Sequence, residues 1–136
     1  MKSFFYYFIS MIVLDFIWFS CALTLYHTEL EFLKVIDNKL YLYLSAGFVY
    51  ILMALAQTLF ILPMYFVSNS QVLVKSILLG VIIYGVYDLT NAIFIPNWSW
   101  KIVFIDIIWG GVIFVIPNIL LLLCKKIRNS LVKTVN

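Results

Sequence analysis

The chain alternates between four long apolar runs and short polar connections, and this pattern predicts its architecture. The runs cover residues 4–26, 41–67, 72–95 and 101–124. A helix that rises 1.5 Å per residue crosses a hydrocarbon core about 30 Å thick with about 20 residues, and each run is long enough. Membrane-spanning strands need only about 10 residues with alternating hydrophobicity, and the runs do not alternate. The sequence therefore predicts an all-α integral membrane protein, a bundle of four transmembrane helices in a single domain over residues 1–136.

The first run could be mistaken for a signal peptide, because Lys2 precedes it. It is longer than the apolar region of such a peptide, contains Asp15 and lacks a small-x-small cleavage site. We therefore expect an uncleaved helix. The connection at residues 27–40 is expected to be a solvated loop, with a short amphipathic helix on the membrane surface as the alternative.

The composition agrees with a membrane protein. Hydrophobic residues make up 65% of the chain and charged residues 11%, whereas a soluble domain has about 25% charged residues. The net charge of +3 comes largely from a basic tail at residues 125–136, so membrane lipids are the expected partners and nucleic acid is not. The spacing of Cys21, Cys124 and His27 suggests no metal site, so we expect neither a metal nor another cofactor, and we expect both cysteines to be buried rather than paired.

The distribution of Lys and Arg predicts the orientation. Because each run crosses the membrane, successive connections lie on opposite sides, which puts six basic residues on one side and three on the other. The first side holds Lys2, Lys75, Lys125, Lys126, Arg128 and Lys133, and the second holds Lys34, Lys39 and Lys101. Positive residues are enriched on the cytoplasmic side. Both termini are therefore expected to be cytoplasmic, with residues 125–136 as a frayed cytoplasmic tail.

Three aspartates inside the apolar runs are the candidate site. Carboxyl groups are costly within a bilayer and by default indicate function there. With the predicted orientation, Asp15 lies near the midplane, Asp88 about 10 Å deep from the far side and Asp106 about 7 Å deep, at 1.5 Å per residue. Asp88, Asn91 and Asp106 should therefore share a layer, with Asp15 as the floor of the same pocket.

Helical spacing adds four supporting side chains. Tyr84, Asp88 and Asn91 are four and three residues apart and share one stripe, which Tyr87 flanks. Trp18 follows Asp15 by three residues, and Trp109 follows Asp106 by three. An indole donates but cannot accept a hydrogen bond, so each tryptophan could serve a carboxylate on another helix.

Two further patterns concern the helices that hold these residues. The motif Asp-x-Ile-Trp occurs twice, at residues 15–18 and 106–109, which would fit an inverted repeat, although so short a match in an apolar chain is weak. Gly110 and Gly111 would let a neighbouring backbone approach closely. Gln57 and Asn118, as single amides, are expected to hydrogen-bond one helix to another.

None of the runs contains a Lys or Arg that could pair with the aspartates. A carboxylate buried without a cation, beside other carboxylates, is unfavourable in its charged form. We therefore expect one or more of the three to be protonated at neutral pH, or to share a proton. A proton carrier or a cation site needs such an arrangement.

Two strings and one tryptophan between them resemble a known family. The strings are Tyr84-Gly85-Val86-Tyr87-Asp88-Leu89-Thr90-Asn91 and Asp106-Ile107-Ile108-Trp109-Gly110, with Trp98 between them, and Leu14-Asp15-Phe16-Ile17-Trp18 is similar to the family's motif in its first helix. These residues resemble the bacterial membrane proteins grouped as domain-of-unknown-function family 2177. The resemblance implies four membrane helices and a location in the bacterial inner membrane. It implies no activity, because the family has none established.

Three functions remain open from the sequence. In the first, a proton- or cation-coupled transporter or channel, Asp15 and Asp88 exchange protons while Asp106, Asn91 and the tyrosines bind a small cationic or amphipathic ligand. Four helices rarely enclose a pathway, so this function predicts a homodimer.

The second function is an intramembrane enzyme or lipid-binding protein, in which Asp88 and Asp106 act as acid and base on a lipid head group. The sequence offers no nucleophilic Ser or Cys beside an evident base, which disfavours an enzyme. The third is a structural or accessory subunit, whose polar side chains only hydrogen-bond the helices together.

Overall fold

A computed structural model describes residues 1–31 and 38–135, with side chains described as far as residue 125. The chain forms α1 (Lys2–Glu29), α2 (Lys39–Ala56), a π-helical turn η1 (Gln57–Ile61), a 3₁₀ turn η2 (Leu62–Phe66), α3 (Asn69–Phe94) and α4 (Trp100–Val135). Four segments are long and apolar enough to span a membrane: Lys2–Glu29, Lys39–Phe66, Asn69–Phe94 and Trp100–Lys125. The protein is thus an all-α membrane protein with four transmembrane helices.

Local sequence explains where the helices begin and end. The side chains of Asn38 and Ser68 cap α2 and α3 by accepting hydrogen bonds from the first turn of each helix. α3 ends just before Pro96, and Asn97 makes the tight turn to α4 with a positive φ of 63°. Asn is among the non-glycine residues that tolerate this region best.

The second span changes its helical pitch before α3 begins. Pro63 has no backbone N–H, so it cannot complete a regular α-helical turn, and η1 and η2 replace that turn. The fourth helix runs on to Val135, beyond the predicted end at residue 124, so the expected frayed tail is helical here. Of the connection predicted at residues 27–40, residues 32–37 lie outside the described part, while residues 27–29 belong to α1 and residues 39–40 to α2, so both helices extend into the predicted loop.

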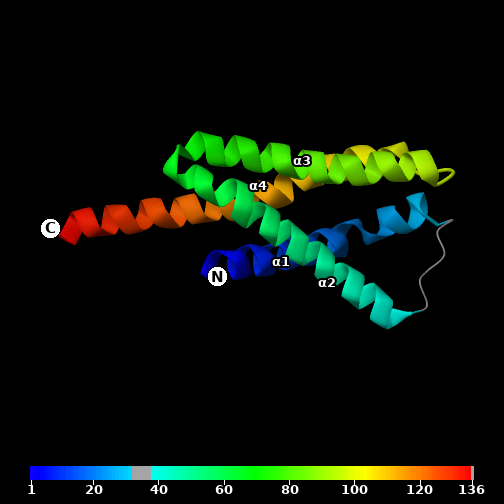
Figure 1. The fold of residues 1–136 in the computed structure, drawn as a ribbon, viewed down its shortest axis with the longest axis horizontal. Coiled ribbons are helices and arrows are strands. Elements are labelled where there is room, and N and C mark those ends of the chain that lie inside the picture. Colours follow the sequence, from blue (N-terminus) through cyan, green and yellow to red (C-terminus); the bar gives the residue numbers. More distant parts are fainter. Residues whose placement is uncertain (32–37, 136) are drawn as a thin grey trace.

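α3 and α4 pack against each other more extensively than any other pair of helices in the described chain. Figure 1 shows them side by side and antiparallel, with α2 crossing obliquely and α1 below them. Gly80 and Gly110 make the closest approach, since a Cβ built on Gly80 would lie 1.9 Å from the Gly110 carbonyl oxygen. The predicted close backbone approach at Gly110 is confirmed, and we call this contact the glycine crossing.

The apolar surface matches a lipid environment. Large side chains such as Phe16, Phe48, Phe60 and Phe104 are exposed, while the buried apolar cluster is small and consists of Met11, Met53, Ile113 and Phe114. Cys21 and Cys124 are also exposed, as free thiols, so the expectation that they are buried was wrong. Thiols are weakly polar and are tolerated on an apolar helix surface.

Candidate functional site: a buried acidic pocket

The predicted site residues lie mostly around one cavity of about 280 Å³, which we call the acidic pocket. Its wall is formed by residues of α1, α3 and α4 and of the turn between the last two, namely Asp15, Phe19, Tyr26, Leu30, Tyr84, Tyr87, Trp98, Asp106 and Trp109. Two carboxyl groups and six aromatic side chains therefore face a common space. The wall contains no Lys or Arg from the part of the chain with described side chains.

Asp15 is held by the opposite helix. Its side chain is 6% exposed, and Oδ1 accepts a hydrogen bond of 2.7 Å from Nε1 of Trp109 on α4. The hydroxyl of Tyr50, on α2, lies close to the same carboxyl group. The prediction that an indole serves a carboxylate on another helix is confirmed for this pair.

Asp106 is also held by a side chain of the opposite helix, and a tyrosine hydroxyl lies between it and the nearest tryptophan. Its side chain is 8% exposed, and Tyr26 on α1 donates its hydroxyl hydrogen to Oδ1. That hydroxyl in turn accepts a hydrogen bond of 3.1 Å from Nε1 of Trp18. Each of the two helices thus supplies a donor to the aspartate of the other.

The indoles of Trp18 and Trp109 stack between these two aspartates. Their ring centroids are 4.5 Å apart and their planes differ by 11°. The two copies of Asp-x-Ile-Trp therefore meet across antiparallel helices, and each tryptophan is connected to the aspartate of the other copy, Trp109 directly and Trp18 through the Tyr26 hydroxyl. This reciprocity is what an inverted pair of motifs would produce, and the duplication itself stays a hypothesis.

Asp88 lies near Asp106 but behind the wall of the pocket. It is 0% exposed, and neither carboxyl oxygen makes a hydrogen bond of normal geometry to a described residue, although the Trp98 indole lies close to it. Nε1 of Trp98 and Nδ2 of Asn91 are likewise buried and unpaired within the described chain. Buried polar atoms nearly always have partners, so this group of three needs an explanation, such as water, an ion or a ligand that completes it.

The structure therefore divides the predicted residues into two sets. Asp15, Asp106, Tyr84, Tyr87 and Trp109 line the pocket, whereas Asp88 is buried near Asp106 and Asn91, one turn further along α3, is half-buried and does not line it. Trp18 contacts the pocket through its hydrogen bond and its stacking. A role for any of these residues in binding stays a prediction.

Three hydrogen-bonding side chains at the site were not predicted as part of it, namely Tyr26, Tyr50 and Trp98, and neither were the apolar wall residues Phe19 and Leu30. Tyr26 follows Asp15 by 11 residues, which is close to three full helical turns at 3.6 residues per turn, so helical spacing could have identified it. Trp98 lies in a short turn, and Tyr50 on a different helix. No sequence spacing predicts their proximity to the aspartates, because it depends on how the helices pack.

A second polar group lies on the other side of the glycine crossing, and we call it the amide network. Nδ2 of Asn118 donates to Oε1 of Gln57 and to Oγ of Ser76, both at 3.0 Å. Oδ1 of Asn118 accepts from the hydroxyls of Tyr7 and Tyr65, both at 2.9 Å. The amides therefore connect all four spans, which confirms their predicted role between helices.

Lys101 and Glu29 form an ion pair outside the pocket, where α1 ends and α4 begins. Nζ of Lys101 lies 2.9 Å from Oε1 of Glu29, and Oγ of Ser99 donates to Oε2 of the same carboxylate at 2.6 Å. This contact ties the end of α1 to the start of α4 beside the pocket. Within the described residues, no three His, Cys, Asp or Glu side chains are grouped closely enough to hold a metal ion.

Comparison with known proteins gives a family and no activity. A family model described as "Predicted membrane protein (DUF2177)" matches residues 1–120. That range includes the acidic pocket, the glycine crossing and the amide network. No curated protein and no solved structure matches the chain.

Proposed function

Because the chain belongs to the family of predicted membrane proteins DUF2177, its chemistry takes place in a bilayer, and we propose that it is a small proton-coupled carrier for a cationic solute. The single observation that best supports this is Asp88, a fully buried carboxyl group with both oxygens unpaired among the described residues, next to a second buried aspartate. A group that served only to hold helices together would be hydrogen-bonded.

The proposed mechanism follows from the cost of charge in a membrane. A net charge buried in the bundle is unfavourable, so a protonated carboxyl group is the stable form of the empty site. A cation that enters the acidic pocket replaces the proton, and the charge of the site stays constant. Asp106 and Asp15 face the cavity and contact the solute, while Asp88 accepts or releases the exchanged proton.

The aromatic wall supports a cation as the solute. Tyr84, Tyr87, Trp98 and Trp109 surround the cavity together with Phe19 and Tyr26. Aromatic faces attract cations by about 0.5–2 kcal/mol each, more when the cation is desolvated. With no basic side chain in the described wall, an anion would have little to bind.

Two further parts of the proposal concern the whole assembly. We place both termini in the cytoplasm of a bacterial inner membrane, because the basic residues favour that side. We also propose a homodimer, because four helices alone give a small enclosed pathway. Cysteine labelling at each terminus and the mass of the purified particle test these two statements.

Proton flux in proteoliposomes that contain a pH-sensitive dye tests the proposed function. We expect the native protein to move protons when a small amine is added on one side, and Asp88→Asn to abolish this flux. Glu31→Gln is the matched control, because it makes the same change at an exposed turn residue. A folded native protein that moves no protons with any amine tested would contradict the proposal and favour a structural subunit.

A further inference from the structure

A second cavity, the α2–α3 groove, lies next to the acidic pocket. It has a volume of about 510 Å³ and is lined by Val49, Leu52, Met53, Ile83, Tyr84 and Tyr87. This is within the size range of small-molecule sites, roughly 300–1,000 Å³. Figure 1 shows that α2 and α3 diverge from the turn that connects them, and the residues that line the groove come from these two helices.

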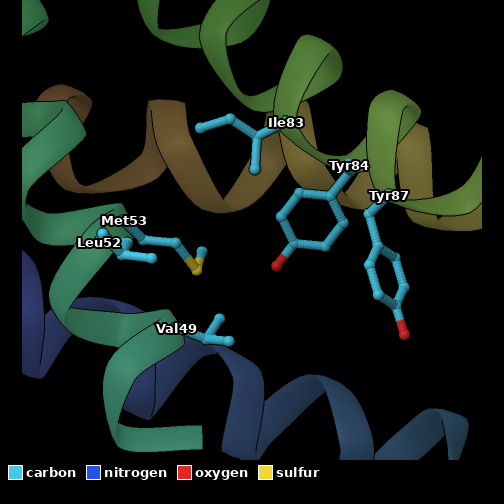
Figure 2. Close-up of a pocket in the computed structure, with 6 residues that line it drawn as sticks. All are labelled: Val49, Leu52, Met53, Ile83, Tyr84 and Tyr87. Carbon is cyan, nitrogen blue, oxygen red and sulfur yellow. The ribbon is translucent and has the colours of Figure 1, made fainter. Parts of the chain in front are cut away.

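Two tyrosines line both cavities. Tyr84 and Tyr87 belong to the wall of the groove and to the wall of the acidic pocket. Figure 2 shows both side chains extending from α3, with the Tyr84 hydroxyl directed into the groove towards Met53 and Val49. The two cavities are therefore adjacent, with these two tyrosines common to both walls.

The two cavities differ in chemistry. Apart from the tyrosine hydroxyls, the side chains that line the groove are apolar, and α2 and α3 are both membrane-spanning, so its natural occupant is an aliphatic chain. The acidic pocket presents Asp15 and Asp106, whose oxygens suit a donor with a positive charge. A molecule with an ammonium group at one end and an aliphatic chain at the other matches both cavities at once.

We propose that the solute is an amphipathic amine, whose ammonium group binds Asp106 and Asp15 and whose aliphatic chain fills the α2–α3 groove. This inference rests on the proposed function and specifies its substrate class. Tyr84 and Tyr87 form the boundary between the two ends of the molecule. An alkyl chain adds affinity in proportion to the apolar area that it buries.

Binding of a homologous series of n-alkylamines tests the proposal. Purified native protein in phosphatidylcholine nanodiscs is titrated calorimetrically with butylamine, octylamine and dodecylamine, and empty nanodiscs correct for partition into lipid. We expect dodecylamine to bind at least tenfold more tightly than butylamine after this correction. Dodecanoate, with a similar chain and a negative charge, should not bind.

Filling the groove separates its contribution from that of the pocket. Val49→Trp should remove the advantage of dodecylamine and leave butylamine binding unchanged, with Leu52→Trp as a second variant if the first fails to fold. Phe48→Trp is the matched control, because Phe48 is exposed on α2 and does not line the groove. Asp106→Asn should weaken all amines alike.

The outcomes distinguish this inference from the proposed function. Equal corrected affinities for all chain lengths, together with amine-driven proton flux, would overturn the proposal that the groove binds the aliphatic chain. The proposed carrier function would still stand. Chain-length dependence that persists in both groove variants would also overturn it. Loss of a dimer in Val49→Trp with unchanged dodecylamine affinity would show that a second copy covers the groove instead. Absence of both amine binding and proton flux would overturn the carrier as well.

Discussion

The two buried polar groups on either side of the glycine crossing differ in one respect that matters for function. In the amide network, Asn118 uses both its amide nitrogen and its oxygen, and its side-chain partners come from the other three spans. In the acidic site, Asp88 uses neither oxygen among the described residues. Both groups lie in the same apolar bundle, and tyrosines take part in each.

This difference separates what holds the helices together from what is available for a ligand. A satisfied network contributes to stability and leaves no atom free for a ligand. An unsatisfied buried group costs stability and is retained where it has another use. The substitutions below test this distinction, from the largest expected effect to the smallest.

Gly80→Ala should affect both regions, because Gly80 lies between them. Its new Cβ would lie 1.9 Å from the Gly110 carbonyl oxygen, and backbone cannot move aside as a side chain can. Overpacking of this kind costs about 3 kcal/mol, so we expect a large fall in the free energy of unfolding and loss of proton flux. Unfolding in mixed detergent measures the change in the free energy of unfolding. Gly47→Ala is the control, because a Cβ built on Gly47 has nothing within 4 Å. Native-like stability of Gly80→Ala would contradict the described helix packing.

Asn118→Leu should lower stability without a direct effect on the acidic pocket. It removes four side-chain partners, at about 0.6 kcal/mol for each hydrogen bond between membrane helices, or about 2 kcal/mol in all. Unfolding in detergent measures the loss, and Leu120→Ala on the exposed surface serves as control. Proton flux per folded molecule should stay within twofold. A tenfold loss of flux with unchanged stability would mean that the amide network takes part in transport.

Asp88→Leu should raise the free energy of unfolding, whereas Asn118→Leu should lower it. The same kind of change, a buried polar side chain to leucine, here removes a group that has no partner in the described chain, and relief of that cost should stabilise the protein by about 1 kcal/mol. The same unfolding assay compares it with Asn118→Leu, and the dye assay should register no flux. If Asp88→Leu instead destabilises the protein as much as Asn118→Leu does, the carboxyl group is structural.

Trp109→Phe should have the smallest effect. It keeps an aromatic ring against Trp18 but removes the donor to Asp15, which should cost about 0.6 kcal/mol and change the apparent affinity for amines a few-fold. Trp100→Phe is the matched control, because Trp100 is exposed and lines neither cavity. Equal effects of the two substitutions on stability would contradict the assigned hydrogen bond.

The apolar pattern of the sequence by itself determined the four membrane helices, because only a helix satisfies its own backbone within lipid. It also pointed to the polar side chains of both regions, since such residues are rare in a membrane span and therefore conspicuous. Spacing along one helix showed that Tyr84, Asp88 and Asn91 share a stripe. It showed equally that Asp15 and Asp106 each precede a tryptophan by about one turn.

Only the tertiary structure decided which of these side chains are satisfied. Trp109 could have bonded to any carboxylate or to none, and the rotation of α4 against α1 selects Asp15. The same packing supplies Asn118 with side-chain partners from the other three spans and leaves the oxygens of Asp88 without a hydrogen bond in the described chain. A hydrogen bond between helices depends on their relative rotation and depth, and in a chain whose helices are apolar on nearly every face, the sequence pattern specifies neither.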